Sequence, residues 1–76
     1  ADFTFFPNPV KTEVNIDYKQ TIIDQINIYS LTGKKIHSYE INQTQTSLNL
    51  SNLTTGIYFM NVIAEKESYT VKLIKD

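Results

Sequence analysis

Apolar and polar residues alternate in short runs along this chain of 76 residues, and this alternation restricts the fold more than any other feature. Successive side chains on a β-strand point to opposite faces of the sheet, so a period of two predicts strands with one buried face. Ile, Val, Thr, Tyr and Phe are abundant and favour strands, whereas alanine, the best helix former, occurs only at Ala1 and Ala64. The pattern predicts an all-β fold.

Seven alternating runs are separated by turn residues or charged residues, so we expect about seven strands. They span residues 3–6, 13–18, 23–29, 35–41, 47–50, 57–64 and 68–75. Gly33 and Gly56 lie in two turns, where we expect a Cβ to clash with the turning backbone. Residues 42–46 are all polar and are expected to form a loop. Strands at intervals of about 8–12 residues indicate a small antiparallel β-sandwich.

The composition argues against several classes of function. All seven basic residues are lysines, the net charge is −1, and no arginine is available for bidentate contacts to phosphate or guanine, so nucleic-acid binding is not expected. The absence of cysteine excludes a disulfide scaffold, and no apolar run is long enough to span a membrane. A chain of this length builds one small core, so we expect a single domain over residues 1–76 with no elaborate active site.

No group of residues predicts catalysis or a metal site. His37 is the only histidine and has no carboxylate cluster near it in the sequence, so we expect it to face solvent from a strand. Asp17 and Asp24 flank a turn, and Glu65 and Glu67 lie at a hairpin tip, where charged groups are solvated. We therefore expect no enzyme activity, no cofactor and no small-molecule substrate.

The longest strand candidate, residues 57–64, is apolar on both faces. One face carries Tyr58, Met60 and Val62, and the other carries Ile57, Phe59 and Ile63. In a sandwich only one face of a central strand points into the core. Two explanations remain open for the second face: neighbouring side chains cover it, or Ile57 and Phe59 form part of an exposed docking face for a partner.

Four segments together resemble a known family. They are residues 6–10 (FPNPV), 28–34 (IYSLTGK), 48–59 (LNLSNLTTGIYF) and 71–75 (VKLIK). In this order and spacing they resemble the type A C-terminal sorting domain of the type IX (Por) secretion system of Bacteroidota. Each segment alone is a weak signal, but the combination is specific, and the resemblance covers about residues 5–75. It implies an immunoglobulin-like sandwich of seven strands, which agrees with the strand count.

The resemblance also implies a function. Such domains are fused behind a cargo protein, so residues 1–4 are expected to be the end of a linker or the lead-in to the first strand, and Asp76 the natural C-terminus. They are recognised in the periplasm and pass through an outer-membrane translocon. A sortase-like peptidase usually removes them, which leaves the cargo at the outer membrane and cell surface or outside the cell. The domain is then a secretion signal whose partners are the translocon and the peptidase.

The resemblance assigns the sorting motif to particular residues. These are Pro7, Asn8, Pro9, Leu31, Gly33, Lys34, Leu53, Gly56, Tyr58, Lys72 and Lys75. The two prolines are expected to end the first strand without offering a pairing edge. Leu53 and Tyr58 are expected to close one end of the core as a tyrosine corner does. The last strand can pair with a partner strand or in a weak dimer, and Lys72 and Lys75 either contact the translocon or solubilise the edge.

Two other functions remain open. The first is an accessory adhesion or carbohydrate-binding sandwich, which needs an exposed aromatic platform; Tyr18, Tyr29, Tyr39 and Tyr69 are the candidates, and the absence of tryptophan counts against it. The second is a spacer module, for which we expect a further domain after Asp76.

Overall fold

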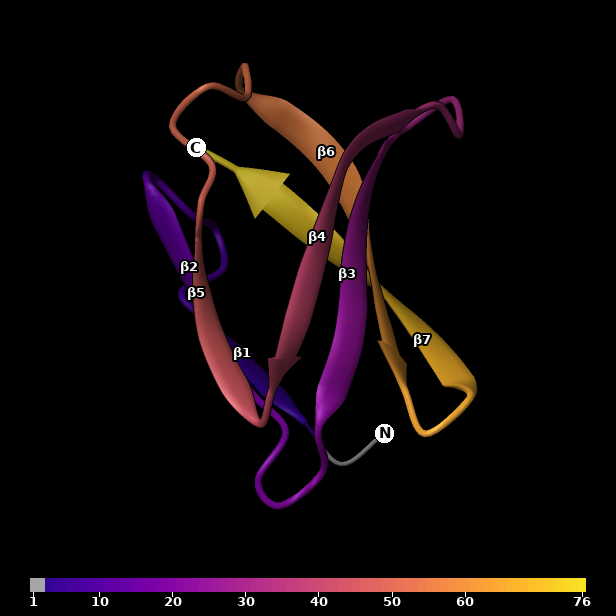
Figure 1. Ribbon diagram of the computed structural model, residues 1–76. Coiled ribbons are helices and arrows are strands. Elements are labelled where there is room, and N and C mark those ends of the chain that lie inside the picture. The colour runs from indigo at the N-terminus through magenta and orange to yellow at the C-terminus, as the bar shows by residue number, and fades with distance from the viewer. Residues whose placement is uncertain (1–2) are drawn as a thin grey trace.

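A computed structural model describes residues 3–76, which form a two-layered β-sandwich (Figure 1). The strands are β1 (Thr4–Phe6), β2 (Glu13–Asp17), β3 (Ile23–Ser30), β4 (Lys35–Gln43), β5 (Gln45–Asn49), β6 (Gly56–Ala64) and β7 (Glu67–Lys75). One sheet has the order β1-β2-β5 and the other β4-β3-β6-β7, and all strand neighbours are antiparallel. The predicted all-β sandwich of seven strands is confirmed. The first two residues of the expected lead-in lie outside the described part of the chain.

Loop length explains why β4 lies in the second sheet. Only residues 31–34 join β3 to β4, and the turn is closed by hydrogen bonds from Ser30 N to Lys34 O (2.8 Å) and from Gly33 N to Ser30 O (2.9 Å). So short a turn forces the two strands to pair with each other. The arrangement differs from the constant-type immunoglobulin sandwich, in which the fourth strand joins the first sheet.

The prediction of a polar loop at residues 42–46 is wrong. β4 continues to Gln43 and β5 begins at Gln45, so Thr44 alone separates them. Gln43 pairs with Ile23 in the second sheet, and Gln45 pairs with Asp17 in the first. Both strands lie at sheet edges, where backbone hydrogen bonds hold a strand whose side chains face solvent. A polar segment can therefore carry the chain from one sheet to the other.

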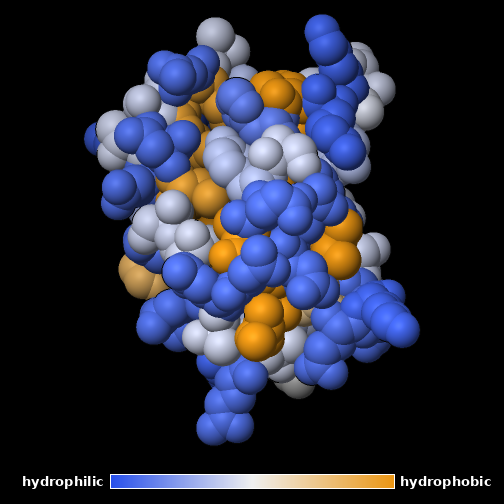
Figure 2. Space-filling model, viewed as in Figure 1, coloured by the Kyte–Doolittle hydropathy of each residue, from blue (hydrophilic) through white to orange (hydrophobic). Residues whose placement is uncertain are grey.

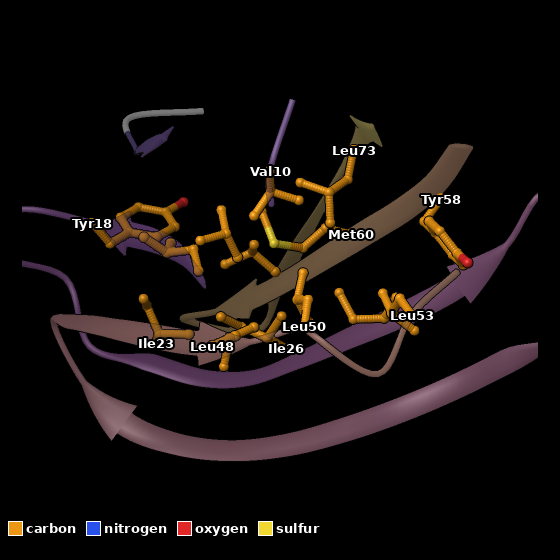
Figure 3. Close-up of a cluster of buried hydrophobic side chains, with 14 of the residues drawn as sticks. Val10, Tyr18, Ile23, Ile26, Leu48, Leu50, Leu53, Tyr58, Met60 and Leu73 are labelled. Carbon is orange, nitrogen blue, oxygen red and sulfur yellow. The ribbon is translucent and has the colours of Figure 1, made fainter. Parts of the chain in front are cut away.

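The core lies between the two sheets, and alternate residues of the strands fill it (Figure 3). The apolar residues at most 2% exposed are Val10, Val14, Ile16, Ile23, Ile26, Ile28, Leu50, Met60, Val62, Ala64 and Leu73. Burying an aliphatic side chain of this kind contributes about 1.5–3 kcal/mol. Figure 3 shows Tyr18 towards one end of the cluster, and Tyr58 beside Leu53 at the other. Of the two apolar faces of residues 57–64, the one with Tyr58, Met60 and Val62 is buried in the core.

The surface carries few exposed apolar side chains. In the view of Figure 2 they form small patches separated by polar residues. Leu31 and Ile57 are 64% and 40% exposed, and Phe6 and Ile22 are 58% and 55% exposed. Within residues 3–76 no helix has the length and apolar character needed to cross a membrane.

Candidate functional site

The end of β7 lies between β6 and the segment Asn8–Val10, which we call the strap. Val10 N donates a hydrogen bond to Ile74 O, and Asp76 N donates to Val10 O, each at 2.8 Å. Val10 is therefore bridged in parallel to Lys75, while β6 pairs with the opposite side of β7. The strap covers the last backbone groups of an edge strand that otherwise has no neighbour on that side among the described residues.

The two prolines explain why the strap binds through a side chain. Proline has no N–H group, so Pro7 and Pro9 cannot donate to a ladder, and Val10 is the first residue after them that can. Between them, the Oδ1 atom of Asn8 accepts a hydrogen bond from Ile74 N at 2.9 Å. The peptide bonds before both prolines are cis. β1 ends at Phe6 as expected, and backbone pairing with β7 begins only at Val10, after both prolines.

Lys75 and Lys72 lie in different environments. Lys72 is exposed, whereas Lys75 is 7% exposed because Leu73 and Lys75 point to the side of β7 that faces the core. Lys75 is opposite Gly56 of β6, and its Nζ atom donates to the carbonyl oxygen of Asp76 at 3.3 Å. A lysine can bury its aliphatic stem in this way. The expectation of an exposed edge lysine thus fits Lys72 but not Lys75.

Leu53 and Tyr58 close the end of the core next to β6. Both are 7% exposed. The hydroxyl of Tyr58 donates to Thr54 O at 2.7 Å and lies 3.1 Å from Thr54 Oγ1. A tyrosine that bonds the backbone a few residues upstream is the arrangement of a tyrosine corner. This hydrogen bond ties the loop before β6 to the start of the strand, so it fixes where β6 begins.

The two glycines are needed for their backbone conformation, not for space. Gly33 has φ +93°, which is unfavourable for residues with a Cβ, yet no atom lies within 4 Å of the position a Cβ would take. At Gly56 the nearest such atom is Cε1 of Tyr58, at 4.0 Å, which is ordinary contact. The expected conflict of a Cβ with the turning backbone thus lies in the positive φ at both positions, +93° at Gly33 and +158° at Gly56, and not in contact with a more distant part of the chain.

The proposed docking residues lie on the outer face of the second sheet. Phe59 is half-buried between its cross-strand neighbours Tyr29 and Lys72, while Ile57 remains 40% exposed beside Ile74. Sequence reasoning missed Tyr29 and Ile74 as members of this face. The register of the strands places them there, and it was not available from any single strand's alternation.

The tyrosines suggested as a sugar platform do not form one. Tyr18 is 7% exposed, with its ring centroid 5.3 Å from that of Phe3, and the other three are half-buried. Tyr39 lies on β4, where burial raises the pKa of its hydroxyl. The described residues thus place these rings partly or wholly inside the protein.

The polar side chains show the following arrangement. His37 is exposed, with its ring centroid 5.8 Å from that of Tyr39. A hollow on the first sheet is lined partly by Phe6, Asn15 and Asp17. The Oδ1 atom of Asp17 accepts a hydrogen bond from Lys19 N at 2.8 Å. No group of three His, Cys, Asp or Glu residues suited to a metal ion occurs within residues 3–76.

Comparison with known proteins agrees with the resemblance. Residues 4–76 match the family described as "Secretion system C-terminal sorting domain", so the match includes all seven strands and the strap. The chain is 29% identical to karilysin of Tannerella forsythia over 89 residues, which cover 99% of the chain and 18% of karilysin. It therefore spans less than a fifth of the length of that relative. The chain belongs to the family of secretion system C-terminal sorting domains, the sorting signals by which type IX secretion delivers cargo to the cell surface or the exterior.

Proposed function

We propose that the type IX machinery recognises this domain in its folded state, and that the surface formed by the strap and the end of β7 is part of what it reads. Recognition takes place in the periplasm, before passage through the outer-membrane translocon. A sortase-like peptidase then separates the domain from its cargo. In this scheme the domain binds other proteins and performs no chemistry itself.

The observation that carries the proposal is the hydrogen bond from Ile74 N to Asn8 Oδ1. It joins two of the sorting-motif segments across 66 positions of the sequence. Bringing such distant residues together costs loop-closure entropy, which only the packing of the whole sandwich offsets. A receptor that contacts both segments therefore distinguishes the folded domain from the unfolded chain.

A reporter protein placed between a signal peptide and this domain tests the proposal in a type IX-competent strain. We expect the reporter outside the cell or on its surface, and in the periplasm of a strain that lacks the translocon. Immunoblotting of the medium, surface and periplasmic fractions measures the distribution. Reporter retained in the periplasm of the competent strain would contradict the proposal.

A pair of variants of the fused domain tests whether the fold is required for export. Val14→Ala with Ile16→Ala removes two core side chains outside the sorting motif, at a combined cost comparable to the stability of so small a domain, about 5 kcal/mol. The matched control, Thr12→Ala with Glu13→Ala, changes two exposed neighbours. We expect export to be lost only in the first variant. If intact reporter carrying the unfolded variant is exported as efficiently as the control, the signal is linear.

Deletion of residues 71–76 tests the role of the last strand. It removes the half of β7 that contacts the strap, so we expect export to stop. Unchanged export of the truncated fusion would show that the receptor does not use this strand.

A further inference from the structure

One row of side chains crosses all four strands on the outer face of the second sheet. The strand register aligns Lys35 of β4 with Tyr29 of β3, Tyr29 with Phe59 of β6, and Phe59 with Lys72 of β7. The row faces away from the core, because Tyr58 and the other buried residues of β6 occupy the alternate positions. Nζ of Lys35 lies 6.0 Å from the centroid of the Tyr29 ring. Two aromatic rings thus lie between two lysines.

A second, wholly apolar row lies beside the first. Ile57 pairs with Ile74 across β6 and β7. Leu31 begins the turn directly after β3, and the last pair of β3 with β6, Ser30 with Tyr58, places the start of that turn at the same end of the sheet as Ile57. Leu31 and Ile57 are 64% and 40% exposed, the former on the turn after β3. We call the apolar side chains of both rows the outer-face patch: Tyr29, Leu31, Ile57, Phe59 and Ile74.

Packing within the domain leaves two members of this patch, Leu31 and Ile57, exposed. At its level of exposure, the side chain of Leu31 gains little hydrophobic free energy from folding. Single exposed apolar residues are ordinary on protein surfaces, but groups of them mark interaction surfaces. Moreover, the patch combines residues from three of the four segments that carry the family resemblance, 28–34, 48–59 and 71–75. The pairing of β3, β6 and β7 brings these segments together at one end of the same sheet.

We propose that the outer-face patch docks a protein partner whose contact surface combines apolar side chains with carboxylates; this inference rests on the proposed function, in which a receptor reads the folded domain. Carboxylates are expected on the partner because exposed lysines surround the patch. Lys35 and Lys72 are both exposed, one at each end of the aromatic row, and Lys34 is exposed in the adjoining turn. Asp76, past the end of β7, is the acidic residue nearest to the patch along the chain. An apolar centre with a charged rim is the usual anatomy of a transient protein interface.

The same charges disfavour two other occupants. A second copy of the domain would bring one lysine rim close to another, and like charges repel across an interface. An anionic lipid surface suits lysines, but Tyr29, Phe59 and Ile74 are half-buried in a sheet face and offer little to insert into a membrane. A protein surface of opposite charge satisfies both the lysines and the apolar rows.

Export of the reporter fusion tests the patch. Lys35→Glu with Lys72→Glu should lower export by about tenfold or more, because both ends of the aromatic row would then repel carboxylates. The control, Lys19→Glu with Lys66→Glu, makes the same change of charge at exposed positions elsewhere and should export normally. Leu31→Ser should also lower export, whereas Ile22→Ser, at a comparably exposed site, should not. Unchanged thermal unfolding of each purified domain shows that the variants fold.

A photoreactive amino acid at Leu31 identifies what lies on the patch in the cell. We expect a crosslink to a type IX component, and exchange of Asp or Glu for Lys on that component should restore export of the Lys35→Glu, Lys72→Glu variant. A crosslink to a second copy of the domain would overturn the inference. Binding of the unmodified domain to phosphatidylglycerol vesicles, lost on charge reversal, would overturn it in favour of a membrane. Normal export of every patch variant would also overturn it, and would leave the proposed function intact as long as export still requires the translocon.

Discussion

The two edge strands of the four-stranded sheet, β4 and β7, are each nine residues long but contact the rest of the molecule very differently. β4 has no buried residue; Tyr39 and Ile41 are its two half-buried members. β7 buries Leu73 completely and Lys75 almost completely, and the strap holds its end. Strand length and position in the sheet therefore do not determine how firmly an edge is held.

The two edges avoid unwanted strand pairing by different means. Along β4, exposed polar and charged side chains such as His37 and Glu40 and irregularities in the register with β3 disfavour an added strand. At β7, a segment of the same chain occupies the last backbone groups instead. Side-chain charge protects an edge without adding tertiary contacts, whereas a covering segment also joins distant parts of the chain. This makes the β7 side the better one for a receptor that has to sense folding.

The largest difference should appear when one core-facing residue is truncated in each edge strand. Leu73→Ala in β7 should lower the free energy of unfolding by about 2–5 kcal/mol, because Leu73 is 0% exposed and its removal leaves a cavity. Ile41→Ala in β4 should cost clearly less, because Ile41 is already half-exposed. Urea denaturation of both variants measures this, and equal losses would show that the two edges are held alike.

Removal of one hydroxyl group from β6, the neighbour of β7, and one from β4 should give a smaller difference. Tyr58→Phe deletes the hydrogen bond to Thr54 O and leaves that carbonyl without this partner, at a cost of about 1–1.5 kcal/mol. Tyr39→Phe on β4 is the matched control and should change stability little. A thermal midpoint for Tyr58→Phe equal to that of the control would show that the tyrosine corner contributes nothing to holding the start of β6.

The smallest effect on stability, and the most local one, should come from the strap. Asn8→Ala removes the acceptor for Ile74 N and should cost about 0.5–1 kcal/mol. Hydrogen exchange should accelerate at the amides of Ile74 and Asp76 and stay unchanged along β4. Asn8→Asp keeps an acceptor oxygen and should preserve protection. Uniform acceleration along both edges would mean that Asn8 acts on the whole fold and not on the end of β7.

Sequence patterns predicted the strands well because alternation is a property of each strand alone. Val14 and Ile16 share one face of β2, and Tyr58, Met60 and Val62 share one face of β6, as their spacing predicted, and both faces point into the core. The polar end of β4 was missed for the same reason. An edge strand is held by backbone pairing, and its side chains leave no apolar signal at residues 42–46.

The candidate site was predicted less well because it depends on contacts between distant segments. The bond between Asn8 and Ile74 and the burial of Lys75 beside Gly56 follow from which strands become neighbours. The same is true of the alignment of Tyr29 with Phe59. One signal was available: Val10 is the first residue after the two prolines that can donate a backbone hydrogen bond, and it is apolar.

The direction of the strap also determines how the domain bears a mechanical load. Val10 runs parallel to Lys75, so tension between the chain ahead of β1 and the end of β7 acts along the two segments in opposite directions. The hydrogen bonds at Ile74 and Asp76 then share the force, and they do not open one after another as they would if the segments were peeled apart. Under a force applied in this direction, the end of β7 would stay in place until these hydrogen bonds break together.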